Sequence, residues 1–225
     1  MDFTNKTVFI TGGSRGIGKT IKETYQKLGA NTISPTRQDM DLSDEQSVEA
    51  YLKSNSDISI DVFVFCAGIN PVAPIEEIDM DDMEETFRVN LFSSIRIIKR
   101  YISNMKKKKT GKIVFITSLY SQVTREGRLP YTGSKHAVLG AVKTLALELA
   151  PYGICVNAVA PGYVMTDMTR QNLSESDINE ICEKIPTGRF QTEEEIADAV
   201  LFLSGDGNKS ITGQTIFVDG GFLCR

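Results

Sequence analysis

Apolar runs of strand type recur along this chain, and they are continuous rather than alternating with polar residues. The runs lie at 7–11, 31–34, 61–67, 112–117, 154–160 and 215–220. A strand carries apolar residues at every position when both faces of its sheet are covered. Helical patterns between the runs are typical of strands that pair in parallel. We therefore expect one α/β domain over residues 1–225, with a doubly wound parallel sheet of six to seven strands and helices on both faces.

One interval between the runs is too short for a crossover helix. The run at 31–34 is followed within a few residues by a possible short strand at 38–42, whereas a parallel crossover takes a dozen residues or more. We expect the helix that would join two such strands to be missing. The sequence SDEQ at 43–46 then has the form of a capping box, which predicts a helix from there through Leu52.

A longer helix is predicted to begin at a capping Asp79. Its apolar residues follow a spacing of three to four and make one stripe, which indicates burial in the core or against another subunit. The stripe consists of Met83, Phe87, Leu91, Ile95, Ile98 and Ile102. The lysine run at 106–109 is typical of a helix C-terminus, and a docking patch is the alternative.

Composition excludes several classes of protein. With 25 basic and 29 acidic residues the net charge is −4, which gives no electrostatic footprint for nucleic acid at the level of the whole chain. No apolar run approaches the ~20 residues that cross a bilayer, and no leader precedes the first strand, so a cytoplasmic protein is expected. The four cysteines lie far apart and His136 is the single histidine, so neither a metal site nor a redox dithiol is expected.

A glycine-rich loop follows the first predicted strand and opens the first predicted helix. Glycines at 12, 16 and 18 in TGGSRGIGKT allow a tight turn and a close approach of the backbone to a pyrophosphate at a helix N-terminus. The spacing is G-x-x-x-G-x-G rather than the more common G-x-G-x-x-G. A loop that only ends a strand is the structural alternative, but the position between strand and helix favours a nucleotide.

Tyr131 and Lys135 stand four residues apart in a small and apolar segment, and therefore share one helix face. If that face lines a pocket, the ammonium group favours the phenolate and lowers the pKa of the tyrosine from its usual value near 10. The tyrosine would then serve as an acid/base catalyst. The alternative is a tyrosine ring that packs beside a solvated lysine.

Eight segments occur in a characteristic order along nearly the whole chain. They are TGGSRGIG at 11–18, CAG at 66–68, VNL at 89–91, Ser118, YTGSK at 131–135, NAVAPGYVMTDM at 157–168, PTGRFQTEEEIA at 186–197 and ITGQTIFVDGG at 211–221. In this order they resemble the short-chain dehydrogenase/reductase family. The resemblance implies a Rossmann-type fold, interconversion of a ketone and a secondary alcohol, and a catalytic tetrad of Asn90, Ser118, Tyr131 and Lys135. It implies that Tyr131 exchanges the proton, Ser118 holds the substrate oxygen, and Asn90 anchors a water relay to Lys135.

The resemblance also implies a nicotinamide dinucleotide held by the glycine loop, by segments that follow several strands and by part of the tetrad. The expected contacts are Gly12, Ser14, Arg15, Gly16, Ile17, Gly18, Arg37, Asp41, Leu42, Cys66, Ala67, Gly68, Asn90, Tyr131, Lys135, Pro161, Gly162, Val164 and Thr166. Family members usually have asparagine where this chain has Cys66.

Arginines near the second strand favour NADP(H) over NAD(H). An NADP enzyme offers arginine to the 2′-phosphate, and Arg37 and Arg15 fit that role. Asp39 lies where the general fingerprint expects the acid of an NAD enzyme. We assign Asp39 to a turn and Asp41 to the edge of the adenine.

The segments PGYVMTDMT and PTGRF are similar to those of 3-oxoacyl-[acyl-carrier-protein] reductases, which implies NADPH-dependent reduction of a 3-oxoacyl thioester. Sugar and polyol oxidoreductases share these segments, and a catalytically silent nucleotide-binding regulator is the alternative from another class. Arg125 and Arg128 could recognise a carboxylate or phosphate on a small substrate, or could be exposed loop arginines.

Two further expectations concern the surface. The resemblance implies a homotetramer or homodimer in which the helices at 80–105 and 131–150 pair with those of another copy. The segment 165–189 is expected to form a lid over the substrate, with possible helix starts at Ser174 and Thr192 and a possible hinge at Gly188. A static surface subdomain is the alternative.

Overall fold

Six parallel strands form one sheet in the computed structural model, which describes residues 1–166, 169 and 174–224. The order of the strands across the sheet is β2-β1-β3-β4-β5-β6. The prediction of a doubly wound parallel sheet is confirmed. The strands are β1 (Thr7–Thr11), β2 (Asn31–Ile33), β3 (Val62–Phe65), β4 (Gly111–Ile116), β5 (Ile154–Pro161) and β6 (Thr215–Val218).

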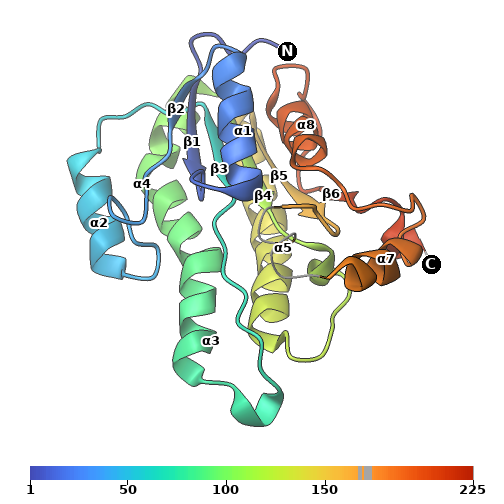
Figure 1. The fold of residues 1–225 in the computed structure, drawn as a ribbon. Coiled ribbons are helices and arrows are strands. Elements are labelled where there is room, and N and C mark those ends of the chain that lie inside the picture. Colours follow the sequence, from blue (N-terminus) through green and yellow to red (C-terminus); the bar gives the residue numbers. More distant parts are fainter. Residues whose placement is uncertain (167–168, 170–173, 225) are drawn as a thin grey trace.

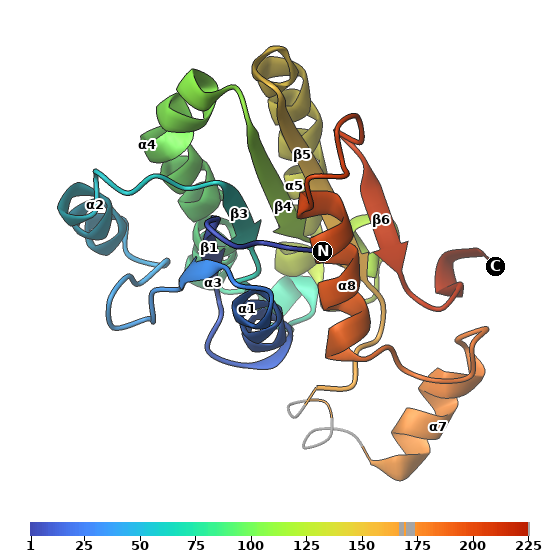
Figure 2. The same ribbon diagram turned by 90° about the horizontal axis from the view of Figure 1, so that it is seen from above.

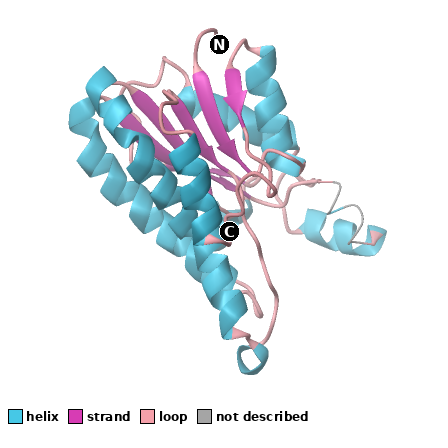
Figure 3. Cartoon of the chain, turned by 90° about the vertical axis from the view of Figure 1, so that its left-hand side faces the viewer, coloured by secondary structure: helices cyan, strands magenta, loops and turns pink. Residues whose placement is uncertain are grey.

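Helices cover both faces of the sheet. Figure 2 shows α1 and α8 on one side and α4 and α5 on the other, and Figure 3 shows the strands between these two layers. α7 stands outside both layers (Figure 1). None of the described helices is long and apolar enough to cross a membrane. The helices are α1 (Gly16–Lys27), α2 (Glu45–Ser54), α3 (Met80–Phe87), α4 (Ser93–Lys108), α5 (Leu129–Leu149), α7 (Glu175–Glu183) and α8 (Glu193–Ser204).

The central strands send side chains of different size to the two faces of the sheet. Successive residues of a strand point to opposite faces. Aromatic rings pack on α4 and α5, and the rings of Phe63 and Phe65 stack with their centroids 5.6 Å apart. β-Branched side chains such as Val62 and Val64 pack on α1 and α8. A run that is uniformly apolar in the sequence therefore builds two different packing surfaces.

Residues 38–42 form no strand, so the sheet has the smaller of the two predicted numbers of strands among the described residues. The carboxylate of Asp39 accepts hydrogen bonds from the backbone N–H and the hydroxyl of Thr36, at 2.9 and 2.7 Å. This turn confirms the assignment of Asp39, and Met40 enters the core directly after it. The chain thus passes from β2 to α2 without a crossover helix, as the short interval predicts.

Two predicted helix starts are confirmed, and a third is displaced by one residue. Ser174 and Thr192 cap α7 and α8 with complete capping boxes. α2, in contrast, begins after Asp44, whose carboxylate accepts a hydrogen bond from Gln46 N at 2.9 Å. The hydroxyl of Ser43 instead donates to Asp41 at 2.7 Å, so Ser43 belongs to the preceding turn.

The long helix predicted from Asp79 is interrupted by a π-helical turn at Arg88–Phe92, between α3 and α4. Asp79 caps it as expected, accepting a hydrogen bond from Asp81 N at 2.8 Å. A π-turn holds an extra residue and so shifts the faces of the helix on either side of it. Within the predicted stripe only Ile98 is fully buried, and the core face of α4 is completed by Ile97, Tyr101 and Met105.

The lysine run ends α4, as its composition predicts. The left-handed residue at the end is Lys109, with φ of 53°, rather than the glycine that follows. Lys106 lies over the ring of Tyr152, 4.7 Å from the centroid, and Lys108 pairs with Asp61 at 2.9 Å. Two of the four lysines therefore have partners within the chain.

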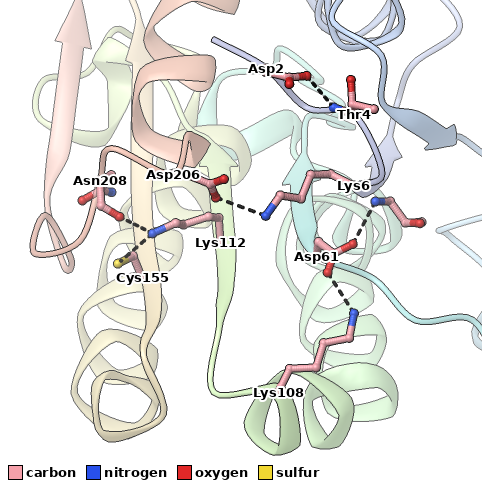
Figure 4. A network of polar contacts seen from close by, with 10 residues as sticks. Asp2, Thr4, Lys6, Asp61, Lys108, Lys112, Cys155, Asp206 and Asn208 are labelled. Atoms are coloured by element: carbon pink, nitrogen blue, oxygen red, sulfur yellow. Dashed lines mark hydrogen bonds and ion pairs between the residues drawn. The ribbon is translucent and has the colours of Figure 1, made fainter.

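Polar contacts join the segments around the amino ends of the strands (Figure 4). Asp61, which precedes β3, accepts hydrogen bonds from the backbone N–H of Thr7 and from Lys108 Nζ, both at 2.9 Å. Lys6 and Asp206 form a more exposed pair at 3.2 Å, in which the side chain of Asp206 is 75% exposed. Of these two carboxylates, only that of Asp61 also accepts a hydrogen bond from a strand N–H in the described part of the chain.

We predict that Asp61→Ala lowers the free energy of unfolding by about 1–3 kcal/mol, because it leaves the N–H of Thr7 without its partner. Asp206→Ala is the matched control and should cost less than about 1 kcal/mol, as exposed ion pairs do. Urea titration at one protein concentration measures both. Equal losses in the two variants would contradict the prediction.

Candidate active site

The predicted site residues gather at the carboxyl edge of the sheet, where the strand order reverses between β1 and β3. Ligands of doubly wound sheets bind in the crevice at such a reversal. Gly12 follows β1 and Cys66-Ala67-Gly68 follows β3, so these two segments meet there. A Cβ on Gly12, whose φ is +72°, would lie 2.7 Å from the backbone nitrogen of Ala67. Only glycine allows the two backbones to lie this close.

The glycine loop leads into α1 with groups suited to an anion. Gly16 begins the helix with φ of +55°. No side chain of the described residues caps this helix, and its first turn contains no acidic residue. The first N–H groups of a helix lack partners within the helix and carry positive partial charge, which suits a phosphate. Gly16, Ile17 and Gly18 therefore fit the pyrophosphate of a dinucleotide, with Ser14 and Arg15 exposed beside them.

A carboxylate that is not among the predicted site residues lies beside this loop. Glu193, in the first turn of α8, accepts a hydrogen bond from the hydroxyl of Thr20 at 2.6 Å. A Cβ on Gly16 would lie 3.8 Å from Glu193 Oε1. The contact joins α8 to α1 across a long stretch of sequence, so no local pattern could reveal it.

Cys66, which replaces the usual asparagine, is a packing residue. A Cβ on Gly18 would lie 3.3 Å from its sulfur. Burial raises the pKa of the Cys66 thiol to about 12, so the group stays neutral. The neighbouring Ala67 N donates to Thr11 Oγ1 at 3.3 Å, which holds the turn that follows β3.

Beyond β2, Arg37 and Asp41 lie together and pair at 2.9 Å. The side chain of Arg37 is 76% exposed, whereas Asp41 also accepts hydrogen bonds from Ser43. Leu42 is partly buried against the core. The guanidinium thus stands at the rim of the predicted adenine side, and Asp41 holds both the turn and the arginine.

The π-turn carries Asn90, which fastens three elements together. Its side-chain oxygen accepts a hydrogen bond from Ile69 N at 2.9 Å, and its nitrogen donates to Ile69 O at 3.1 Å and to Ser134 Oγ at 2.9 Å. A Cβ on Gly68 would lie 3.3 Å from Asn90 Oδ1 and 3.6 Å from Lys135 Nζ. π-Turns often occur at functional sites, and no sequence pattern predicted this one.

Ser118, Tyr131 and Lys135 converge at the same edge from β4 and α5. Ser118 comes just after β4 and is 9% exposed, and Tyr131 lies in the first turn of α5. Lys135 is 4% exposed, donates from Nζ to the carbonyl of Ile116 at 2.9 Å and lies 5.5 Å from the centroid of the Tyr131 ring. The predicted tetrad is thus assembled in space. The alternative of a solvated lysine is wrong, because Lys135 is buried.

The expected lowering of the Tyr131 pKa is wrong for the chain by itself. Burial raises the pKa of Tyr131, and the hydroxyl of Ser118 opposes this only in part. Burial also lowers the pKa of Lys135 to about 8. The ammonium group is bonded to the Ile116 carbonyl instead of the phenol oxygen, so the desolvation of the phenolate outweighs its attraction to the lysine.

The remaining predicted contacts lie after β5 on the same edge. Pro161 ends the strand, and a Cβ on Gly162 would lie 2.7 Å from the Cα of Asp219. Val164 is buried and pairs with Gln191, and Thr166 Oγ1 accepts from Thr169 N at 3.1 Å. In the predicted lid, residues 167–168 and 170–173 lie outside the described part of the structure. The predicted hinge, Gly188, has φ of +70°.

Two further tyrosines, which are not among the predicted site residues, also lie at this site. The ring of Tyr120 meets that of Tyr131 edge-on, with the centroids 6.3 Å apart. Tyr163 lines a cavity of about 350 Å³ together with Arg125 and residues of α7. The spacing of these aromatic residues contains no signal that separates them from the core.

The chain is similar to known proteins over its whole length. A family model described as "Enoyl-(Acyl carrier protein) reductase" matches residues 5–223. The 3-oxoacyl-[acyl-carrier-protein] reductase FabG of Escherichia coli (strain K12) is 34% identical over 241 aligned positions, which cover 98% of each chain.

Solved structures agree with this relationship. A short chain dehydrogenase family protein from Francisella tularensis subsp. tularensis SCHU S4 has a TM-score of 0.88 and 30% identity, with 98% of this chain and 99% of that one covered. A gluconate 5-dehydrogenase from Burkholderia cenocepacia J2315, in complex with NADP and tartrate, has a TM-score of 0.89 and 26% identity, with 100% and 97% covered. The sheet, the glycine loop and these full-length similarities lead to one conclusion: the chain belongs to the short-chain dehydrogenase/reductase family of oxidoreductases.

Proposed function

We propose that this oxidoreductase interconverts a ketone and a secondary alcohol with NADP(H) at the site around Tyr131. The observation that carries the proposal is the convergence of Ser118, Tyr131 and Lys135 beside a glycine loop that fits a pyrophosphate. A bound nicotinamide supplies or accepts the hydride. The residues of the chain have to hold the substrate, place its oxygen and move a proton.

Each of the four polar residues has a distinct role in this proposal. Ser118 holds the substrate oxygen, and Tyr131 gives it a proton during reduction or takes one during oxidation. The raised pKa of Tyr131 keeps the phenol protonated at neutral pH, which suits the acid needed for reduction. Lys135 supplies positive charge and binds the ribose of the cofactor. Asn90 holds the segment after β3 against α5 and anchors the water relay to Lys135.

The relatives support two substrate classes. The name of the Escherichia coli relative supports a 3-oxoacyl thioester, and that of the Burkholderia cenocepacia protein supports a sugar acid. The specific observation in favour of the second class is an arginine, Arg125, in the cavity beside Tyr163.

We expect Tyr131→Phe to reduce turnover by about 10²–10⁴-fold, the usual loss for a positioned general acid, while binding of NADPH is largely kept. Consumption of NADPH with a panel of ketones measures the turnover, and fluorescence titration measures the binding of NADPH. A Tyr131→Phe protein that retains most of its turnover would contradict the proposal. Absence of turnover by the unaltered protein on a broad panel would favour a nucleotide-binding regulator.

The rate of ketone reduction should fall as the pH rises through about 8, because the pKa of Lys135 is lowered to that value and its charge is lost above it. Lys135→Arg is the matched variant, since a guanidinium stays charged at every pH that the assay uses. Its profile should lose the fall near pH 8 even if its absolute rate is lower. If the rate falls at the same pH in both proteins, a group other than Lys135 titrates there.

We also infer that Arg37, with Arg15, recognises the 2′-phosphate of NADP(H). Arg37→Asp should lower the ratio of NADPH to NADH efficiency by about 10- to 100-fold, since a hydrogen bond to a charged group contributes about 1.5–3 kcal/mol. Asp41→Asn is the control, because it removes the partner of Arg37 and keeps the guanidinium. The ratio of NADPH to NADH efficiency should change little in the Asp41→Asn protein. An unchanged ratio in Arg37→Asp would overturn the assignment.

We also propose that the protein self-associates through α4 and α5. Phe92, the last residue of the π-turn before α4, is 49% exposed, and Leu147, near the end of α5, is 80% exposed. A second copy that packs its own α4 and α5 against them would cover this apolar surface. Light scattering should give the mass of two or four chains of 24.8 kDa, and Leu147→Glu should shift the mass downward. A single-chain mass for the unaltered protein at micromolar concentration would exclude the arrangement.

A further inference from the structure

The loop that joins Ser118 to Tyr131 carries two arginines that the proposed chemistry does not use. Arg125 lines the cavity of about 350 Å³ that also touches Tyr163, Ile181 and Lys184. Arg128 stands three residues before Tyr131, at the start of α5. Both cations therefore belong to the segment that connects the two residues proposed to hold and protonate the substrate oxygen.

Arg128 has a buried donor without a partner. Its Nε is buried and has no hydrogen-bond partner among the described residues. Nearly all buried polar groups in folded proteins are hydrogen-bonded, so this Nε needs a partner beyond the described residues, and a bound anion would supply one. A guanidinium binds a carboxylate or a phosphate through two parallel hydrogen bonds, and Nε takes part in one such arrangement.

Hydrogen bonds tie down the backbone of the loop that carries Arg125 and Arg128. Gly127 takes a left-handed conformation with φ of 73°, and its carbonyl accepts a hydrogen bond from Ala73 N at 3.1 Å. The carbonyl of Arg128 accepts from Thr132 N at 2.8 Å, and the hydroxyls of Thr124 and Thr132 lie 3.0 Å apart. The backbone of the arginine loop is thus tied to the segment after β3 and to the first turn of α5.

The charge of Arg128 acts on both Tyr131 and Tyr163, and the charge of Arg125 acts on Tyr163. Burial raises the pKa of Tyr163 to about 12, and the charges of Arg125 and Arg128 oppose that rise. The charge of Arg128 likewise opposes the rise in the pKa of Tyr131. An anion bound to Arg128 would therefore lie within electrostatic reach of both Tyr131 and Tyr163.

Acidic side chains on α7 face the same cavity, but each already has a partner. Glu180 pairs with Lys184 at 2.6 Å, and Asp177 closes the capping box of Ser174. Neither forms an ion pair with Arg125 or Arg128 among the described residues. Glu126 lies between the two arginines in the loop, and no ion pair joins it to either of them within the part of the chain that the structure describes.

We infer that Arg125 and Arg128 bind an anionic group of the substrate, a carboxylate or a phosphate, and so select acidic ketones and hydroxy compounds. This inference rests on the proposed function, because it names the substrate class of the same site. It favours small sugar acids or sugar phosphates over neutral polyols. Arg128 would meet the anion nearer to Tyr131, and Arg125 would meet it from the cavity.

The test compares four ketones that differ in charge. They are 5-ketogluconate, fructose 6-phosphate, neutral fructose and the acetoacetyl thioester of N-acetylcysteamine. Arg128→Gln and Arg125→Gln should each raise KM for the favoured acid by about 10- to 100-fold, with kcat less affected and fructose within about twofold. Arg128→Lys should raise KM for the acid less than Arg128→Gln does, because lysine keeps the positive charge but not the paired N–H donors of the guanidinium. Arg100→Gln, at an exposed position of α4, is the control.

A binding measurement separates this inference from the proposed chemistry. Calorimetry of tartrate, which contains no ketone, with the Tyr131→Phe protein should show binding that Arg128→Gln abolishes. In the kinetic comparison, the KM values for 5-ketogluconate and fructose 6-phosphate decide whether the site prefers a carboxylate or a phosphate.

Each outcome has a definite meaning. Arginine-dependent KM for an acid supports the inference. If fructose or the thioester is reduced, and the arginine variants bind the acid as well as the unaltered protein does, the inference is overturned. The proposed function is then kept. Tartrate binding through Arg128 without reduction of any ketone keeps the anion site and overturns the proposed function. Absence of both overturns the two together.

Discussion

The close contact between two backbones at the reversal of the strand order is the constraint on which the rest of the site depends. Gly12 can lie against Ala67 only because it has no side chain and accepts a left-handed conformation. That contact fixes the crevice between β1 and β3, and the crevice fixes where α1 begins. The proposed phosphate site, the Cys66 turn and the clamp made by Asn90 all follow from this one approach.

The alternation of strands and helices made the fold predictable, because long apolar runs tolerate few other arrangements. The four residues of the proposed tetrad were also predictable, because their types and their order along the chain match the motifs of the family. What the sequence could not supply was the competition between forces at each residue. Tyr131 beside Lys135 indicates a lowered pKa, yet burial wins, and Lys135 turns to a backbone carbonyl that no pattern identifies.

Contacts between distant segments were likewise beyond the sequence. Glu193 meets Thr20 through the packing of α8 on α1, and no periodicity encodes that pair. Asp44 rather than Ser43 caps α2, because the hydroxyl of Ser43 finds a nearer acceptor in Asp41. In both cases the residue types were right for several partners, and only the three-dimensional arrangement selects one of them.

The π-turn at Arg88–Phe92 fixes the length of the chain at that point. Removing one residue would restore a regular helix, but it would rotate everything on one side of the turn by about 100° relative to the other. Either Asn90 would lose its hydrogen bonds to Ile69 and Ser134, or the apolar face of α4 would no longer pack against the sheet. Insertions and deletions should therefore be tolerated in the surface loops of descendants of this chain and rejected within these five residues.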